Sequence, residues 1–160
     1  MSLRLLGVIA DTHGLLRPEA VAALEGCQHI IHAGDIGSRT GEPRGVLDTL
    51  ARIAPLTVVR GNNDRADWAA PIPYTADIEF DGTRIHVLHI LGELAIDPAV
   101  AGVNVVVFGH SHQPRVETRD GVLFVNPGSA GPRRFKLPVS VARLQVEDGR
   151  AEAELVTLLR

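Results

Sequence analysis

The chain has 160 residues and a net charge of −3, and 45% of its residues are hydrophobic against 22% charged. This length suits one domain spanning residues 1–160, and the charge gives no strong signal for a nucleic-acid or membrane-surface binder. Cys27 is the single cysteine, which excludes a disulfide framework and a thiolate metal cluster. The start, MSLRLLGVIADTHG, lacks the long apolar region of a secretory signal, and no apolar run approaches the ~20 residues needed to span a bilayer. We therefore expect a cytoplasmic protein without a membrane partner.

The first half of the chain alternates between short apolar runs and helix-like segments. Three runs are predicted to be buried strands: residues 5–10, 29–32 and 56–60. A helix is predicted over residues 18–26, because proline suits its first turn and glycine its end. A second helix is predicted over residues 44–53, where apolar side chains recur on one face. This βαβαβ order predicts parallel strands with right-handed crossovers.

The second half is dominated by strand pairs joined by Asp-Gly turns. Three hairpins are predicted: residues 76–80 with 84–89, 115–118 with 122–125, and 139–146 with 151–159. A short helix over residues 97–101 and a buried strand over residues 104–108 lie between them. The fold class is therefore α/β, and two packed β-sheets with flanking helices satisfy both halves.

Polar side chains follow five of the predicted strands, at the point where each strand ends. These candidates are Asp11, His13, Asp35, Asn62, His89, His110 and His112. Ligands of open α/β sheets bind at the carboxyl ends of the strands, so we expect the seven side chains to converge. Within each of the two pairs, 11/13 and 110/112, the residues are two apart, and in extended backbone such residues point to the same side.

Seven candidate ligands exceed what one transition ion normally accepts, so two ions sharing a carboxylate are predicted. Asp35 is the predicted bridge, because it follows the strand beside the first one. Mixed imidazole and carboxylate ligands favour manganese, iron, zinc, cobalt or nickel, and manganese is our first choice. Metal pairs roughly 3.5–4 Å apart can clamp a phosphoryl group. Zincin, phosphate-loop and nucleophile-elbow motifs are absent, and an amidohydrolase barrel needs roughly 200 residues or more.

Taken in order, the motifs D-x-H, G-D, G-N-x-D, a strand-end histidine and G-H-x-H resemble those of the calcineurin-like metallophosphoesterases. The stretch APLTVVRGNND and the late NPGS at residues 126–129 are similar to the small bacterial and archaeal phosphodiesterase branch. The resemblance extends from residue 5 to about residue 158. It implies a four-layer αββα fold of two packed mixed β-sheets flanked by helices.

The resemblance also implies an activity, namely metal-dependent hydrolysis of small phosphate esters, most directly phosphodiesters. It assigns the first metal to Asp11, His13, Asp35 and His112, and the second metal to Asp35, Asn62, His89 and His110. A hydroxide bridging the two ions would attack phosphorus in line. The predicted catalytic residues are Asp35, His89 and Asn63. The exposed hairpins of a small chain are compatible with a homodimer.

Two positions depart from the family pattern. Asn63 stands where many relatives carry His or Cys, and His89-Ile90-Leu91 stands where the family often reads H-G-H. Asparagine donates only a neutral hydrogen bond, so weak action on esters with poor leaving groups is expected, and Ile90 and Leu91 are expected to narrow the site or to shift the loop. The alternatives are a catalytically weak metal-binding regulator, or an interaction scaffold like the relative of this fold that serves in the retromer coat.

Several of these residues also have purely structural explanations. Asp11 suits a helix N-cap, Asn63 suits a turn as well as a phosphate contact, and Asp64 is predicted to orient its loop. Histidines inside strands are predicted to be packed or at the surface rather than ligating: His29, His32 and His86. Arg133 and Arg134 are predicted to be a solvated pair or to contact a phosphate. Trp68 and Tyr74 are predicted to cover the core or an interface.

Overall fold

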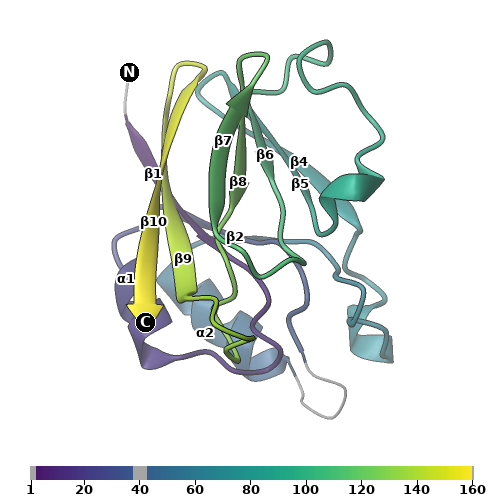
Figure 1. Ribbon diagram of the computed structural model, residues 1–160, viewed down its shortest axis with the longest axis vertical. Coiled ribbons are helices and arrows are strands. Elements are labelled where there is room, and N and C mark those ends of the chain that lie inside the picture. The colour runs from purple at the N-terminus through teal and green to yellow at the C-terminus, as the bar shows by residue number, and fades with distance from the viewer. Residues whose placement is uncertain (1–2, 38–42, 160) are drawn as a thin grey trace.

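The chain folds into two five-stranded β-sheets that pack against each other, as seen in a computed structural model that describes residues 3–37 and 43–159 (Figure 1). The first sheet has the order β10-β9-β1-β2-β3. Its strands are β1 (Arg4–Ile9), β2 (His29–His32), β3 (Leu56–Val58), β9 (Val139–Glu147) and β10 (Arg150–Leu159). Strands β1, β2 and β3 are parallel, which confirms the predicted βαβαβ unit, and β9 pairs antiparallel with β1.

Two helices cover the outer face of the first sheet: α1 (Pro18–Leu24) and α2 (Arg44–Ile53). Helix α1 carries proline in its first turn, where the missing N–H costs no hydrogen bond. Leu24 of α1 and Leu50 of α2 pack in one cluster with Ile9 and Ile30 of the sheet. Both helices therefore bury an apolar face against the sheet, as the apolar spacing of residues 44–53 predicts for α2.

The second sheet has the order β4-β5-β6-β8-β7. Its strands are β4 (Thr75–Phe80), β5 (Thr83–Leu88), β6 (Val105–Val107), β7 (Arg115–Arg119) and β8 (Val122–Asn126). The parallel pairs β5–β6 and β6–β8 make it a mixed sheet. All three predicted hairpins are confirmed, and each turn begins at an aspartate with positive φ followed by a glycine with positive φ: Asp81, Asp120 and Asp148. Positive φ at both central residues is the requirement of a type I′ turn.

The outer face of the second sheet is covered by the segment between β5 and β6. This segment begins with a single 3-10 turn, η2 (Leu91–Glu93). The helix predicted at residues 97–101 is wrong, because the chain forms hydrogen-bonded turns there. Among the described residues, no helix has the length and apolar character required to cross a membrane.

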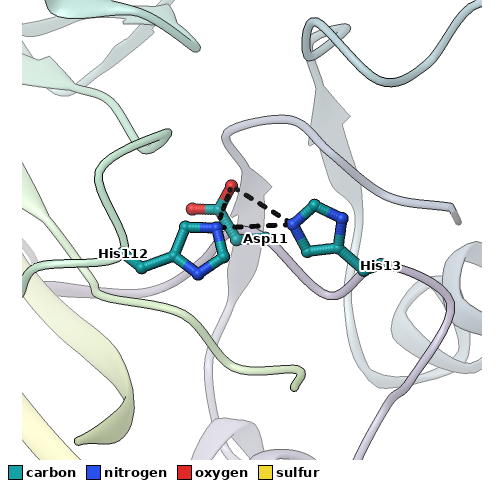
Figure 2. A group of neighbouring side chains, drawn as sticks. All are labelled: Asp11, His13 and His112. Carbon is teal, nitrogen blue, oxygen red and sulfur yellow. Dashed lines mark hydrogen bonds and ion pairs between the residues drawn. The ribbon is translucent and has the colours of Figure 1, made fainter. Parts of the chain in front are cut away.

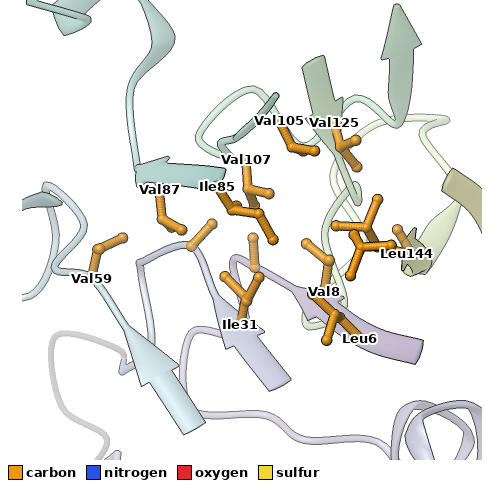
Figure 3. Packing of buried hydrophobic residues seen from close by; sticks show 14 residues of the cluster. Leu6, Val8, Ile31, Val59, Ile85, Val87, Val105, Val107, Val125 and Leu144 are labelled. Carbon is orange, nitrogen blue, oxygen red and sulfur yellow. The ribbon is translucent and has the colours of Figure 1, made fainter. Parts of the chain in front are cut away.

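The main core lies between the two sheets and consists largely of β-branched side chains. Strand β1 contributes Leu6 and Val8, which face the second sheet, while Ile9 faces the helices. Figure 3 shows Leu6, Val8 and Ile31 opposite Ile85 and the valines of the second sheet. This alternation along β1 buries both faces of the strand. Because the strand is packed on both faces, its carboxyl end, which precedes Asp11, is held in a fixed position.

Candidate metal centre

Most of the predicted ligands adopt an unusual backbone conformation. Five of them have positive φ: Asp11 (55°), His13 (47°), Asp35 (56°), His110 (74°) and His112 (63°). Non-glycine residues rarely adopt this left-handed conformation, which costs of order 1–3 kcal/mol each and clusters at functional sites. The expectation that the pairs 11/13 and 110/112 share one side of extended backbone is therefore wrong. The side chains converge because the chain turns sharply at each strand end.

The first group of converging side chains comprises Asp11, His13 and His112 (Figure 2). Asp11 Oδ1 lies 4.0 Å from His13 Nε2 and 3.6 Å from His112 Nε2, and the two nitrogens are 3.4 Å apart. His112 comes from the loop after β6, 99 residues beyond His13. Tertiary structure thus brings together ligand atoms from two distant strand ends around one point.

A second group comprises Asp11, Asp35 and His89. His89 Nε2 lies 3.3 Å from Asp35 Oδ2 and 3.8 Å from Asp11 Oδ1. Asp35 Oδ2 is also 3.8 Å from His13 Nε2, so this carboxylate touches one histidine of each predicted metal set. Asp11 is shared by the two groups as well. Both carboxylates lie between the imidazoles, and the choice of Asp35 as the bridge stays a prediction.

The remaining two predicted ligands lie beside this second group and contact each other. His110 Nδ1 is 3.1 Å from Asn62 Oδ1, and the His110 and His89 rings are 5.3 Å apart. The backbone N–H of His110 donates to Asp11 Oδ2. The structure therefore places all seven predicted ligands in one neighbourhood, five of them in the two carboxylate-imidazole groups.

Hydrogen bonding leaves the inward-facing nitrogen of His89 free. Its Nδ1 is 2.7 Å from the carbonyl oxygen of Ala33, which can only accept, so Nδ1 carries the proton. His89 Nε2 is then the ring nitrogen that faces Asp35, 3.3 Å from its Oδ2. A bond from the far ring nitrogen to a backbone carbonyl is the usual way in which a ligating histidine is oriented.

Buried polar atoms without partners mark the same place. Within the described residues, Asp11 Oδ1, His89 Nε2 and His112 Nδ1 are buried and make no hydrogen bond. Buried polar atoms are nearly always paired, so such orphans need an explanation. Asp11 Oδ1 and His89 Nε2 are the atoms that face the two groups described above. Divalent cations held there would satisfy both atoms, so the donor set fits a metal centre.

Burial and neighbouring groups shift the pKa values of the two buried carboxylates in opposite directions. Burial raises the pKa of Asp11 to about 7, although His89 nearby acts to lower it. Burial would also raise the pKa of Asp35, but His89 and the backbone N–H of Asn63 outweigh it and lower that pKa to about 2. Burial lowers the pKa of His13 and lowers that of His112 to about 4. Neutral imidazole is the form that ligates metal.

Neighbouring residues hold the ligand loops in place. Asp64 accepts hydrogen bonds from the backbone N–H groups of Ile36, Gly37 and Gly61, which confirms its predicted role in orienting its loop. Asn63 donates to the carboxylate of Asp35 from both its backbone N–H and its side-chain amide. Asn63 therefore lies in contact with a predicted ligand.

Two residues of the NPGS stretch, Asn126 and Ser129, support the ligand loops. The Asn126 amide donates to the carbonyl of Gly109, directly before the G-H-x-H histidines. The Ser129 hydroxyl donates to the carbonyl of Asp11. The motif NPGS marks both residues in the sequence. In the structure they hold the ligand loops in position through these hydrogen bonds.

His32 links two of the ligand loops from within the core. Thr12 donates its hydroxyl proton to the carbonyl of Ile36, so the His32 Nε2 that lies 3.0 Å from that hydroxyl must be the donor in their bond. The backbone N–H of Gly34 donates to His32 Nδ1. His32 is therefore a neutral imidazole with its proton on Nε2. It was predicted to be packed or at the surface rather than ligating, and it is fully buried.

Because of this arrangement, His32 should make stability dependent on pH. Burial lowers the pKa of His32 from 6.5 to about 3, so below pH 6.5 the unfolded chain takes up a proton that the folded chain refuses. At pH 5 this should cost about 2 kcal/mol of unfolding free energy relative to neutral pH. We expect urea denaturation at pH 7 and pH 5 to show a smaller loss in His32→Gln than in the wild type. An equal loss of unfolding free energy in the two proteins would contradict the assignment of His32 as a neutral imidazole in the folded state.

The chain matches known proteins along most of its length. Residues 5–149 match the family model described as the calcineurin-like phosphoesterase superfamily domain. A probable metallophosphoesterase of Methanothermobacter thermautotrophicus is 32% identical over 166 residues, covering 95% of this chain and 91% of that protein. The phosphodiesterase YfcE of Escherichia coli K12 is 29% identical, with 84% of each chain covered.

Similarity in three dimensions agrees with these sequence matches. Vps29 of Entamoeba histolytica, in a crystal structure with Zn²⁺, superposes with a TM-score of 0.72 at 22% identity, covering 96% of this chain and 99% of that one. This similarity confirms the fold of two packed mixed sheets. With the family model covering nearly the whole chain, the protein belongs to the calcineurin-like phosphoesterase superfamily.

Proposed function

We propose that the protein is a dinuclear metal-dependent phosphodiesterase. The observation that carries the proposal is the pair of carboxylate-imidazole groups that share Asp11, with two unpartnered buried atoms facing them. The relationship to proteins named metallophosphoesterase and phosphodiesterase supports the same reaction class. Small phosphate esters are the proposed substrates, with diesters preferred.

The proposed ligand sets follow the family pattern. One metal would be held by Asp11, His13, Asp35 and His112, and the other by Asp35, Asn62, His89 and His110. Bound there, two divalent ions would supply positive charge to phosphoryl oxygens and lower the pKa of a water molecule toward neutrality. We propose manganese as the native metal, with iron, nickel, zinc and cobalt as alternatives that suit the same ligands.

The protein's own residues would position this centre rather than attack the substrate. Asn63 fixes the orientation of the Asp35 carboxylate with two hydrogen bonds. The carbonyl of Ala33 holds the proton of His89 on Nδ1, away from the centre. Asp11 and Asp35, placed among imidazoles, balance the charge of the bound cations. Catalysis then depends on orientation and charge placement in a largely preformed site.

The test is to measure metal content and hydrolysis in one preparation. Protein purified with added manganese should hold about two equivalents per chain by elemental analysis, and it should hydrolyse bis(p-nitrophenyl) phosphate. Chelation should abolish hydrolysis, and manganese should restore it. Bound metal without hydrolysis across several esters would favour the regulator or scaffold alternative. A chain that binds no metal would refute the dinuclear site itself.

A further inference from the structure

A cavity of about 680 Å³ opens directly beside the proposed metal centre. Asn62 and His89, both proposed ligands, form part of its wall. The remainder of the wall includes Tyr74, Ile90, Arg60 and Arg65. Small-molecule sites typically have volumes of roughly 300–1,000 Å³. The cavity is therefore large enough for an organic group attached to a phosphate at the centre.

Tyr74 is an exposed aromatic side chain that is nevertheless held in place. Its side chain is 65% exposed. The Arg60 guanidinium lies 4.3 Å from the ring centroid, and its Nη1 donates to the Tyr74 hydroxyl. Arg60 is itself fixed by hydrogen bonds to the carbonyls of Ala70 and Ile72. A ring that is ordered before a ligand arrives loses little conformational freedom on binding.

Another part of the cavity wall is apolar. Leu88 and Ile90 line the cavity on either side of His89 in the sequence. Ile90 occupies the position where the family motif often has glycine, so this chain presents a branched aliphatic group beside a proposed ligand. Tyr74 and Ile90 therefore give the cavity wall an aromatic and an aliphatic side chain.

The charges of the cavity suit an anionic ligand. Arg60 and Arg65 both line it, and in the described part of the chain neither forms an ion pair with a carboxylate. Arg65 donates from Nε to the carbonyl of Asn62, which holds its guanidinium at the edge of the centre. Two acidic residues, Glu93 and Asp64, also line the wall, and Asp64 is buried and accepts hydrogen bonds from three backbone N–H groups.

On these grounds we propose that the cavity binds the organic substituent of the phosphate ester and selects a planar aromatic one, such as a phenyl group or a nucleobase, through contact with Tyr74 and Ile90. The inference rests on the proposed phosphodiesterase function, because it places the phosphate at the metal centre. It assigns Tyr74 as a specificity-determining residue. The departure from H-G-H at Ile90 then forms a binding wall instead of merely narrowing the site.

Equilibrium binding of two phosphonates to the manganese-loaded protein tests this inference without requiring turnover. By calorimetry, the wild type should bind phenylphosphonate about tenfold more tightly than methylphosphonate, the gain expected of one aromatic contact. Tyr74→Ala should reduce the ratio to near one, while Tyr74→Phe should retain most of it. Phe135→Ala is the matched control, because Phe135 is 86% exposed and is not part of the cavity wall. It should leave the ratio unchanged.

The outcomes separate this inference from the proposed function. Hydrolysis of bis(p-nitrophenyl) phosphate is measured in the same preparations, and thermal melts confirm that each variant is folded. Hydrolysis with equal affinity for the two phosphonates, or with a ratio that Tyr74→Ala leaves intact, would overturn the inference alone. A Tyr74-dependent preference without any hydrolysis would uphold the inference and overturn the enzyme proposal. Failure to bind either phosphonate would overturn the inference.

Discussion

Asp35→Asn is expected to lower kcat/KM for bis(p-nitrophenyl) phosphate by about 10³-fold. Asp35 contacts one histidine from each proposed metal set, so an uncharged amide there weakens both ion sites at once. Metal ions contribute several kcal/mol of charge stabilisation to phosphoryl transfer, and about 4 kcal/mol corresponds to this factor. The measurement is steady-state kinetics at saturating manganese.

A second readout separates metal binding from chemistry. Manganese should raise the melting temperature of the wild type, because a ligand that binds only the folded state stabilises it. The shift should be much smaller in Asp35→Asn and in His112→Ala. Asp81→Asn is the control, because Asp81 lies in the exposed β4–β5 turn, at the opposite end of β5 from His89, and asparagine also suits that turn. Full activity and a full melting shift in Asp35→Asn would contradict the proposed bridge.

The elements that the sequence predicts well are those encoded by neighbouring residues. The Asp-Gly pairs located all three hairpins, since a two-residue turn fixes both the reversal and the register of its strands. The boundaries of α2 match the predicted residues 44–53, which follow from its apolar spacing. In these cases the signal and the structure lie within a few residues of each other.

The sheet topology is not encoded in this local way. Strand β9 inserts beside β1, and β8 lies between β6 and β7, so residues far apart in the chain become neighbours. Hydrophobic periodicity gives the face of each strand but not its partner. The predicted short helix at residues 97–101 failed for a related reason. That segment forms hydrogen-bonded turns instead of a helix, and most of its residues are exposed.

The candidate site shows the same division. Strand ends bearing Asp, His or Asn identified the seven ligand candidates, because parallel strands present their carboxyl ends at one edge. The left-handed backbone of Asp11 and His112 was not predictable, since the surrounding fold, not the residue type, stabilises it. The hydrogen bonds from His32 to Thr12 and from Ser129 to Asp11 join residues 20 and 118 positions apart. The hydrophobic periodicity of the sequence gives no indication of such long-range hydrogen bonds.

Gly61→Ala is expected to lower activity by at least about 10²-fold, although Gly61 carries no functional group. A Cβ atom at this position would lie 2.1 Å from Asp35 Oδ1 and 2.2 Å from the Asp35 backbone nitrogen. Real Cβ contacts are never this short, so the loop after β3 must move away from Asp35. A displacement of about 1 Å at a catalytic centre can cost 10²-fold in rate. The same overpacking should lower the free energy of unfolding by about 1–3 kcal/mol.

Gly45→Ala provides the matched control for this substitution. Gly45 lies in α2 and is exposed, and a Cβ atom there would meet nothing within 4 Å. Alanine should therefore stabilise the protein by about 0.5–1 kcal/mol, through the lower entropy cost of ordering the helix, and leave hydrolysis intact. Urea denaturation should therefore show the free energy of unfolding lowered in Gly61→Ala and raised in Gly45→Ala, while kinetics should show a loss of activity in Gly61→Ala alone. If Gly61→Ala behaved like Gly45→Ala, the close packing of the two loops would not be what holds Asp35 in position.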